Sequence, residues 1–183
     1  MTTLLYLVVV LVAAGLLYAL LRRPVSEYYR MRGTRVVACP ENEQPAAVTV
    51  DARRAALTAA AGHEHLRLDS CSRWPEKAGC GQECLRQIEA QPTDCLVRTQ
   101  VDRWYADKSC AICGKALGQV EWAAHAPALR APDGRTLEWR DVKPETMFQV
   151  MGSHAAVCWD CHVAETFRRQ RPDLVLDNPF AKS

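Results

Sequence analysis

An uninterrupted apolar run near the start of the chain constrains the fold more than any other feature. Leu4 to Leu21 is a stretch of eighteen residues without a charge. As a helix rising ~1.5 Å per residue, this run spans about 27 Å, close to the hydrocarbon thickness of a bilayer. No basic residue precedes it, and Arg22, Arg23 and Pro24 follow in place of a small-residue cleavage site. We therefore predict an uncleaved transmembrane anchor over residues 1–23, rather than a signal peptide or a buried core helix.

The charges around this run predict its orientation and its partners. Residues 24–35 form a basic juxtamembrane segment, and no charged side chain precedes the run. The positive-inside tendency therefore places the C-terminal body in the cytoplasm of a single-pass cell-membrane protein, with a periplasmic body as the alternative. Residues 36–183 carry 18 basic and 20 acidic side chains, which predicts no binding to nucleic acid. We expect Leu4 to Leu21 to contact the lipid bilayer, and a membrane or membrane-associated protein to be the partner.

Nine cysteines among 183 residues make thiol chemistry the informative feature of the body. The full chain, with 49% hydrophobic and 24% charged residues, has the balance of a globular protein. We predict an α+β fold in which a single N-terminal transmembrane helix precedes a small cysteine-rich body of two packed modules. The modules cover residues 36–100 and 101–172, and residues 173–183 form a tail.

Short patterns predict the elements of the modules. In the first module they are a hairpin of strands at 36–38 and 46–50, a helix at 52–61 capped by Asp51, a strand at 66–68 and a helix at 82–90. In the second module they are a helix or turn at 101–105, a hairpin at 110–120, a strand at 136–139, and helices at 143–151 and 158–169.

Two C-x2-C pairs give the strongest local signal. Cys110 and Cys113 are followed by Gly114, and Cys158 and Cys161 open the last predicted helix. A tight turn aims the sulfurs of such a pair at one ion, and a helix N-terminus helps to hold thiolate charge. Together the two pairs supply a tetrahedral set of four ligands.

The order of knuckle, hairpin, loop and terminal helix resembles the treble-clef or zinc-ribbon-like zinc module, over residues 108–172 of a membrane-anchored chain of bacterial type. This resemblance implies Cys110, Cys113, Cys158 and Cys161 as the ligands of a structural zinc ion. The 44 residues between the pairs exceed the common finger spacing, so the loop must fold out as an insertion.

Other interpretations of the same residues remain open. Cys158, Cys161 and His162 also match the attachment pattern of c-type haem. A thiol-redox pair at Cys110 and Cys113 would need a helix directly after the second cysteine. Structural disulfides would follow if the body were periplasmic.

The cysteines of the first module predict a second, weaker metal site. Cys39 and Cys71 end predicted strands, and Cys80 and Cys84 are placed four apart on one face of a predicted helix. These four can converge on one ion. Zinc is preferred over an iron–sulfur cluster because no run has ferredoxin-type spacing. Cys95 is left over.

No catalytic or nucleotide-binding motif is present in the sequence. A zinc ion with four sulfur ligands has no open position for water, so we lean against an enzyme. The predicted function is that of a membrane-anchored interaction or scaffold subunit with one or two structural zinc ions. The alternatives are an electron-transfer protein with haem c or an iron–sulfur cluster, and a thiol-redox protein.

Overall fold

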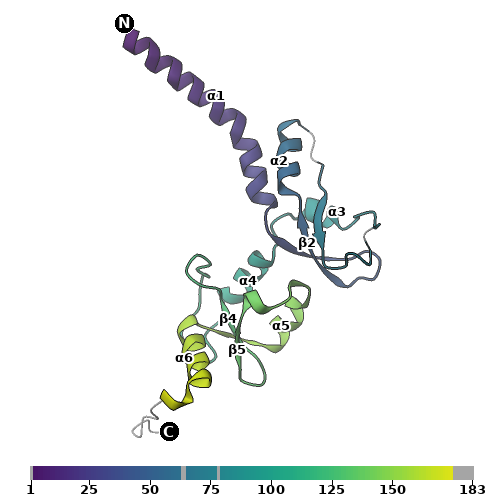
Figure 1. Ribbon diagram of the computed structural model, residues 1–183, viewed down its shortest axis with the longest axis vertical. Helices are drawn as coiled ribbons and strands as arrows, with labels where there is room; N and C mark the ends of the chain where they lie inside the picture. Colours follow the sequence, from purple (N-terminus) through teal and green to yellow (C-terminus); the bar gives the residue numbers. More distant parts are fainter. Residues whose placement is uncertain (1, 63–64, 78, 175–183) are drawn as a thin grey trace. The chain divides into compact units, whose positions relative to one another are not determined.

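The computed structural model describes residues 2–62, 65–77 and 79–174. These residues form two compact units, Met1–Val97 and Arg98–Ser183 (Figure 1). Each unit has its own three-stranded antiparallel sheet, and helices occur in both. The mixed α and β character expected from the sequence is thus confirmed.

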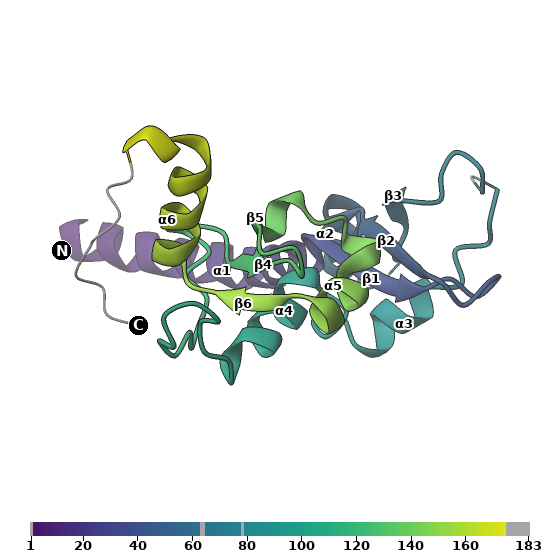
Figure 2. The ribbon, with the colours of Figure 1, turned by 90° about the horizontal axis from the view of Figure 1, so that it is seen from below.

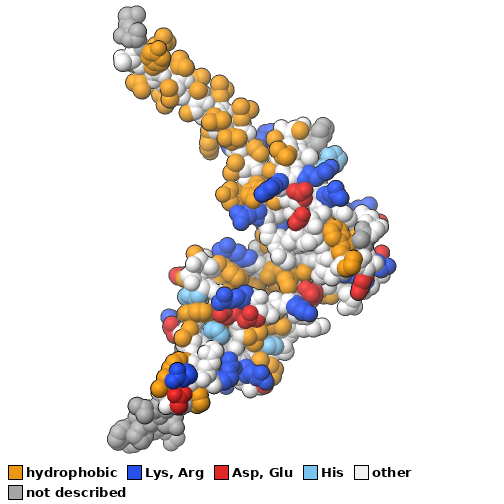
Figure 3. All heavy atoms as spheres, in the orientation of Figure 1, with side chains coloured by type: hydrophobic (Ala, Val, Ile, Leu, Met, Phe, Trp, Pro, Cys, Tyr) orange, Lys and Arg blue, Asp and Glu red, His pale blue; other side chains and the backbone are white. Residues whose placement is uncertain are grey.

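The first unit begins with α1 (Thr2–Met31), a helix of 30 residues that is long and apolar enough to cross a membrane. The large apolar side chains from Leu4 to Leu21 are all 49–73% exposed, and Figure 3 shows them on the surface of this helix. The helix passes through Pro24, so most of the predicted juxtamembrane segment is helical. A helix that is apolar on every face is stable in lipid or against a partner rather than in water.

The sheet of the first unit has the strand order β1-β2-β3. β1 (Thr34–Ala38) pairs with β2 (Pro45–Val50) in the predicted hairpin, which is therefore confirmed. The strand predicted at 66–68 overlaps β3 (Leu68–Cys71) only at Leu68. β3 pairs with β2 from Val50 to Val48, so its paired residues begin at Leu68. Figure 2 shows the three strands side by side. Cys71 is the last residue of β3.

Two short helices complete the first unit. α2 (Ala52–Ala60) begins as predicted, since the Asp51 carboxylate accepts a hydrogen bond of 2.9 Å from the Arg54 N–H. Its buried Ala55 and Ala56 are small enough to let it pack closely beside α1. The second helix is α3 (Leu85–Ala90).

The predicted helical face shared by Cys80 and Cys84 is wrong. Cys84 is the N-cap residue of α3, and Cys80 lies in the preceding turns. Gln82 takes a left-handed backbone conformation with φ of 55°, which stops the helix from starting earlier. Its side-chain oxygen accepts the Leu68 N–H at 3.0 Å, so a contact to β3 holds this turn in place.

Arg35 ties α1 to the rest of the first unit. Its side chain is fully buried, and its Nη1 donates to the carbonyls of Met31 at 2.7 Å and Gly33 at 3.1 Å. Nη2 donates to the Arg30 carbonyl at 2.7 Å, and Nε donates to the Pro92 carbonyl at 3.2 Å. The guanidinium thus satisfies the last carbonyls of α1, which have no partner within the helix.

The second unit surrounds a sheet of strand order β5-β4-β6. Its helices are α4 (Val97–Ala106), α5 (Met147–Ser153) and α6 (Trp159–Gln170), joined by short 3-10 turns at Trp139–Asp141 and Pro144–Thr146 and followed by one at Pro172–Leu174. Its strands are β4 (Ala128–Arg130), β5 (Thr136–Glu138) and β6 (Ala155–Val157). The last predicted helix and the strand at 136–139 are confirmed, and the remainder of the predicted tail, residues 175–183, lies outside the described residues.

The hairpin predicted at 110–120 is reduced to one antiparallel bridge, between Ser109 and Ala116, around the turn that holds Cys110 and Cys113. The hairpin of the unit is instead β4 with β5, and β6 pairs along the other edge of β4. Tyr105 links α4 to this sheet, because its buried hydroxyl donates to the carbonyl of Ala128 and accepts from Trp139 Nε1. β4 and β6, with three residues each, were not predicted, because so short a segment shows little alternation.

Candidate metal centre

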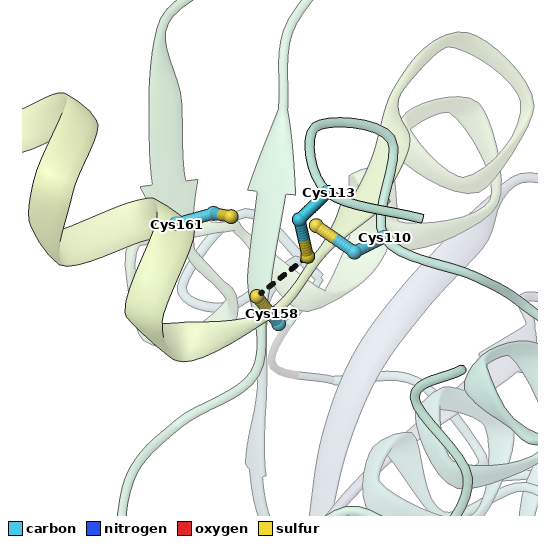
Figure 4. A group of neighbouring side chains, drawn as sticks. All are labelled: Cys110, Cys113, Cys158 and Cys161. Atoms are coloured by element: carbon cyan, nitrogen blue, oxygen red, sulfur yellow. Dashed lines mark hydrogen bonds between the residues drawn. The ribbon is translucent and has the colours of Figure 1, made fainter. Parts of the chain in front are cut away.

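The first cysteine pair lies in a tight turn between α4 and β4. The Cys110 N–H donates to the Lys115 carbonyl at 2.8 Å, and the Gly114 N–H donates to the Cys110 carbonyl at 2.9 Å. Gly114 has a φ of 75°, which glycine adopts without a steric penalty. The turn therefore folds back on itself and directs the Cys110 and Cys113 side chains to the same side (Figure 4).

A backbone hydrogen bond joins this turn to the second pair. The Ala111 N–H donates to the Ala156 carbonyl in β6 at 2.9 Å. Ala156 also pairs with Leu129 of β4, so the sheet fixes its position. Because Cys158 follows only two residues later, β6 carries the second pair to the first.

Cys158 and Cys161 lie at the start of α6. Cys158 is the N-cap residue with an extended backbone, and its carbonyl accepts the His162 N–H at 3.0 Å. Cys161 lies in the first helical turn. The positive end of the helix dipole favours thiolate charge at both positions.

The structure brings the four predicted ligands together, and they can hold a metal ion. The sulfur atoms of Cys110, Cys113, Cys158 and Cys161 all lie within 4.8 Å of one another. Cys113 Sγ and Cys158 Sγ are 3.7 Å apart (Figure 4). Metal–sulfur bonds of ~2.3 Å in a tetrahedron place the sulfurs about 3.8 Å apart, which matches this distance.

The surroundings shift the pKa values of Cys110, Cys158 and Cys161 in different directions. Burial opposes ionisation of Cys110, but the N–H groups of Cys113, Cys158 and Ile112 lower its pKa to about 6. The Ile112 nitrogen lies 3.5 Å from Cys110 Sγ. Burial raises the pKa of Cys158, and burial together with the neighbouring thiols raises that of Cys161. Additional negative charge in this cluster therefore needs a cation to offset it.

His162 lies beside the cluster but faces another residue. It is 8% exposed, and its Nε2 lies 3.7 Å from Glu138 Oε1 in β5. Attachment of c-type haem would require His162 to face a haem beside Cys158 and Cys161, with the other pair elsewhere. In the structure His162 faces Glu138, and Cys110 and Cys113 lie next to Cys158 and Cys161.

The segment after the first pair also bears on the thiol-redox alternative. Residues 114–127, all of which are described, form turns and irregular backbone instead of a helix. The pair at Cys110 and Cys113 therefore lacks the following helix that activates a redox cysteine in such motifs.

The cysteines of the first unit surround a separate cavity of about 230 Å³. Its lining includes all four members of the second predicted set, which are Cys39, Cys71, Cys80 and Cys84. They are less close than the first set: among the described residues, only the cysteines of the second unit form a group with all sulfurs within 4.8 Å. Burial, and then the charges of the other three thiols, raise the pKa of Cys84.

Long-range hydrogen bonds hold the two sides of this cavity together. The side chain of Gln87 in α3 accepts the Ala38 N–H at 3.0 Å and donates to the Ala38 carbonyl at 2.7 Å. This two-point contact fixes Cys39, the next residue, relative to Cys84 on α3. Sequence analysis missed it because a glutamine 49 residues away carries no pairing signal.

Sequence analysis also missed Arg73, whose Nη1 lies 3.6 Å from Cys39 Sγ as a hydrogen-bond donor. The available signal was the position of Arg73 two residues after Cys71. Cys95 lies away from the cavity lining, and its Sγ donates to the Gln91 carbonyl at 3.3 Å.

Comparison of the chain with models of protein families, with curated proteins and with solved structures finds no match.

Proposed function

We propose that this chain is a single-pass membrane protein whose second unit holds one structural zinc ion and serves as an interaction or scaffold subunit at the membrane. The observation that carries the proposal is the convergence of four sulfur atoms from two remote segments within 4.8 Å. Four thiolates in a tetrahedral arrangement are a preferred ligand set of zinc.

The surroundings of the sulfurs support a treble-clef type of module. A knuckle with glycine after the second cysteine precedes the β4–β5 hairpin, and the second pair opens the last long helix, α6. The hydrophobic core next to the site is small. Its buried residues are Ala128, Val157 and the ligand Cys110 itself. In a unit with so little apolar burial around its cysteines, an ion supplies much of the folding free energy.

The anchor is proposed from α1 and its flanks. Near the end of the apolar run, Tyr18, Leu20 and Arg22 line a surface hollow together with Ala60 of α2. α2 thus lies beside the same end of α1 at which the arginines begin. Arg22 and Arg23 are exposed there and are suited to lipid phosphates on the cytoplasmic side.

A scaffold role follows from the coordination chemistry. Four protein sulfurs would fill the zinc shell and leave no site for a water nucleophile or a substrate. We infer that the ion fixes the shape of the second unit for contact with a membrane or membrane-associated protein.

Metal analysis of the full chain in detergent tests the zinc site. We expect about one zinc ion to be lost from Cys113→Ser and from Cys161→Ser. Ile112→Ser, in the same turn but between the ligands, should keep the zinc content of the wild type. A covalently bound haem in the visible spectrum, or equal zinc content in all variants, would refute the site.

A reporter fused after Ser183 tests the orientation. A fusion active only in the cytoplasm supports the proposed topology. Activity of a periplasm-dependent reporter would reverse it.

A further inference from the structure

The first unit contains a second cysteine set that the proposed zinc site does not use. Cys39 follows β1, Cys71 ends β3, Cys80 lies in the turns after it, and Cys84 caps α3. All four line one cavity of about 230 Å³, although they come from four separate segments. Free cysteines in a core have no reason to gather around a common space, so their convergence indicates a shared ligand.

The spacing of this set differs from that of the zinc set. A mononuclear zinc ion needs four sulfurs about 3.8 Å apart, since each is bonded at ~2.3 Å to the same atom. Among the described residues, the sulfurs of the first unit do not form such a group, whereas those of the second unit do. The same chain thus shows a closed set and an open set of four cysteines.

We propose that the cavity of the first unit binds an iron–sulfur cluster through Cys39, Cys71, Cys80 and Cys84. In a cluster the thiolates bind different iron atoms, and inorganic sulfides occupy the space between the irons. The ligating sulfurs therefore stand around a larger object than a single ion, which suits an open set around a cavity. A linear motif is unnecessary here, because the sheet and α3 rather than one loop position the ligands.

The surroundings of the cavity also suit a cluster. The Arg73 guanidinium is a donor to Cys39 Sγ at 3.6 Å, and hydrogen bonds of this kind stabilise cluster-bound sulfur. Trp74 Nε1 is buried and has no hydrogen-bond partner among the described residues, and Trp74 lines the same cavity. Val37, Val48 and Leu68 give the inner wall an apolar surface that excludes water.

The cavity is firmly framed. The paired hydrogen bonds of Gln87 with Ala38 hold α3 against β1. The Gln82 side chain accepts the Leu68 N–H and so fixes the turn between Cys80 and Cys84 to β3. A site with ligands held from several sides keeps its cysteines apart until a cluster joins them.

The test uses the full chain, purified in detergent without oxygen and analysed for iron, acid-labile sulfide and zinc. We expect two to four iron atoms per chain with an equal amount of sulfide, together with the broad visible absorption of iron–thiolate bonds. If the isolated chain contains little iron, anaerobic incubation with ferric iron, sulfide and dithiothreitol should restore these values.

Variants assign the ligands and separate the two sites. Cys39→Ser and Cys71→Ser should lose at least half of the iron and sulfide while keeping one zinc ion. Cys95→Ser, a cysteine of the same unit outside the cavity lining, should keep both. Cys113→Ser should lose zinc and keep iron. The iron and sulfide contents therefore test the cluster proposal even if the zinc proposal fails.

Two outcomes would overturn the inference. One is two zinc ions per wild-type chain with no iron after reconstitution. The other is iron that survives in Cys39→Ser and Cys71→Ser to the same extent as in Cys95→Ser. The first outcome is measured on the wild type, so it does not depend on whether a variant folds.

Discussion

Loss of a single ligand at the metal centre should unfold the second unit more readily than its packing alone would predict. Cys113 is the exposed member of the set, so Cys113→Ser removes almost no buried surface. Any large effect must therefore come from the metal. Ile112→Ser is the matched control, since its side chain is 38% exposed in the same turn and it is not a ligand.

The size of the effect follows from the loop that the ion closes. Cys113 and Cys158 are 45 residues apart in the chain, and a shared ion links them in the folded state. For a cross-link that closes a loop of this length, the entropic contribution to the free energy of unfolding is about 4 kcal/mol at 25 °C, and we take this as the scale of the ion's contribution. For a unit of this size, the thermal midpoint should fall by roughly 15–30 °C.

Tryptophan fluorescence gives a signal from the unit concerned, because four of the five tryptophans follow residue 98. Thermal unfolding is measured for the wild type and both variants, with zinc and after treatment with a chelator. Zinc should raise the midpoint of the wild type and of Ile112→Ser, and it should have little effect on Cys113→Ser.

Equal midpoints with and without zinc in the wild type would refute the reasoning. A chelator that lowers the midpoint of Cys113→Ser as much as that of the wild type would also refute it. The decrease in midpoint would then not depend on an ion bound by all four cysteines.

Three further changes test other parts of the structure. Arg35→Met removes the four hydrogen bonds that the buried guanidinium donates around the end of α1. In denaturant titration it should lower the unfolding free energy of the first unit by about 3–5 kcal/mol. The control Arg53→Met, at an exposed position, should change this free energy by less than about 0.5 kcal/mol. Val12→Arg should make the full chain extractable by carbonate, because a charge at the centre of a span costs about 2.5–3.5 kcal/mol, whereas Val25→Arg, beyond the apolar run, should leave it in the membrane fraction. Tyr105→Phe deprives the sheet of its hydroxyl contacts and should destabilise the second unit by about 1–2 kcal/mol in thermal unfolding; an unchanged midpoint would show that these contacts contribute nothing net.

Features that depend on neighbouring residues could be predicted from the sequence. The apolar run from Leu4 to Leu21 predicts a helix able to cross a membrane, since hydrophobicity and length suffice for that. Asp51 before an alanine-rich segment predicts the start of α2, because the cap bond joins residues only three apart. The C-x2-C spacing predicts which four cysteines of the second unit come together, as a tight turn and a helix start place each pair locally.

Features that depend on remote contacts were decided by the tertiary structure. The path by which the two pairs meet runs through β4, β6 and the hydrogen bond from Ala111 to Ala156, and none of these leaves a pattern in three-residue strands. The start of α3 was misplaced because the left-handed Gln82 is held by Leu68, fourteen residues earlier. The open spacing of the first cysteine set likewise depends on how Gln87 holds α3 against β1. The sequence by itself determined which cysteines gather in each unit, and the non-local backbone contacts decided how closely they gather.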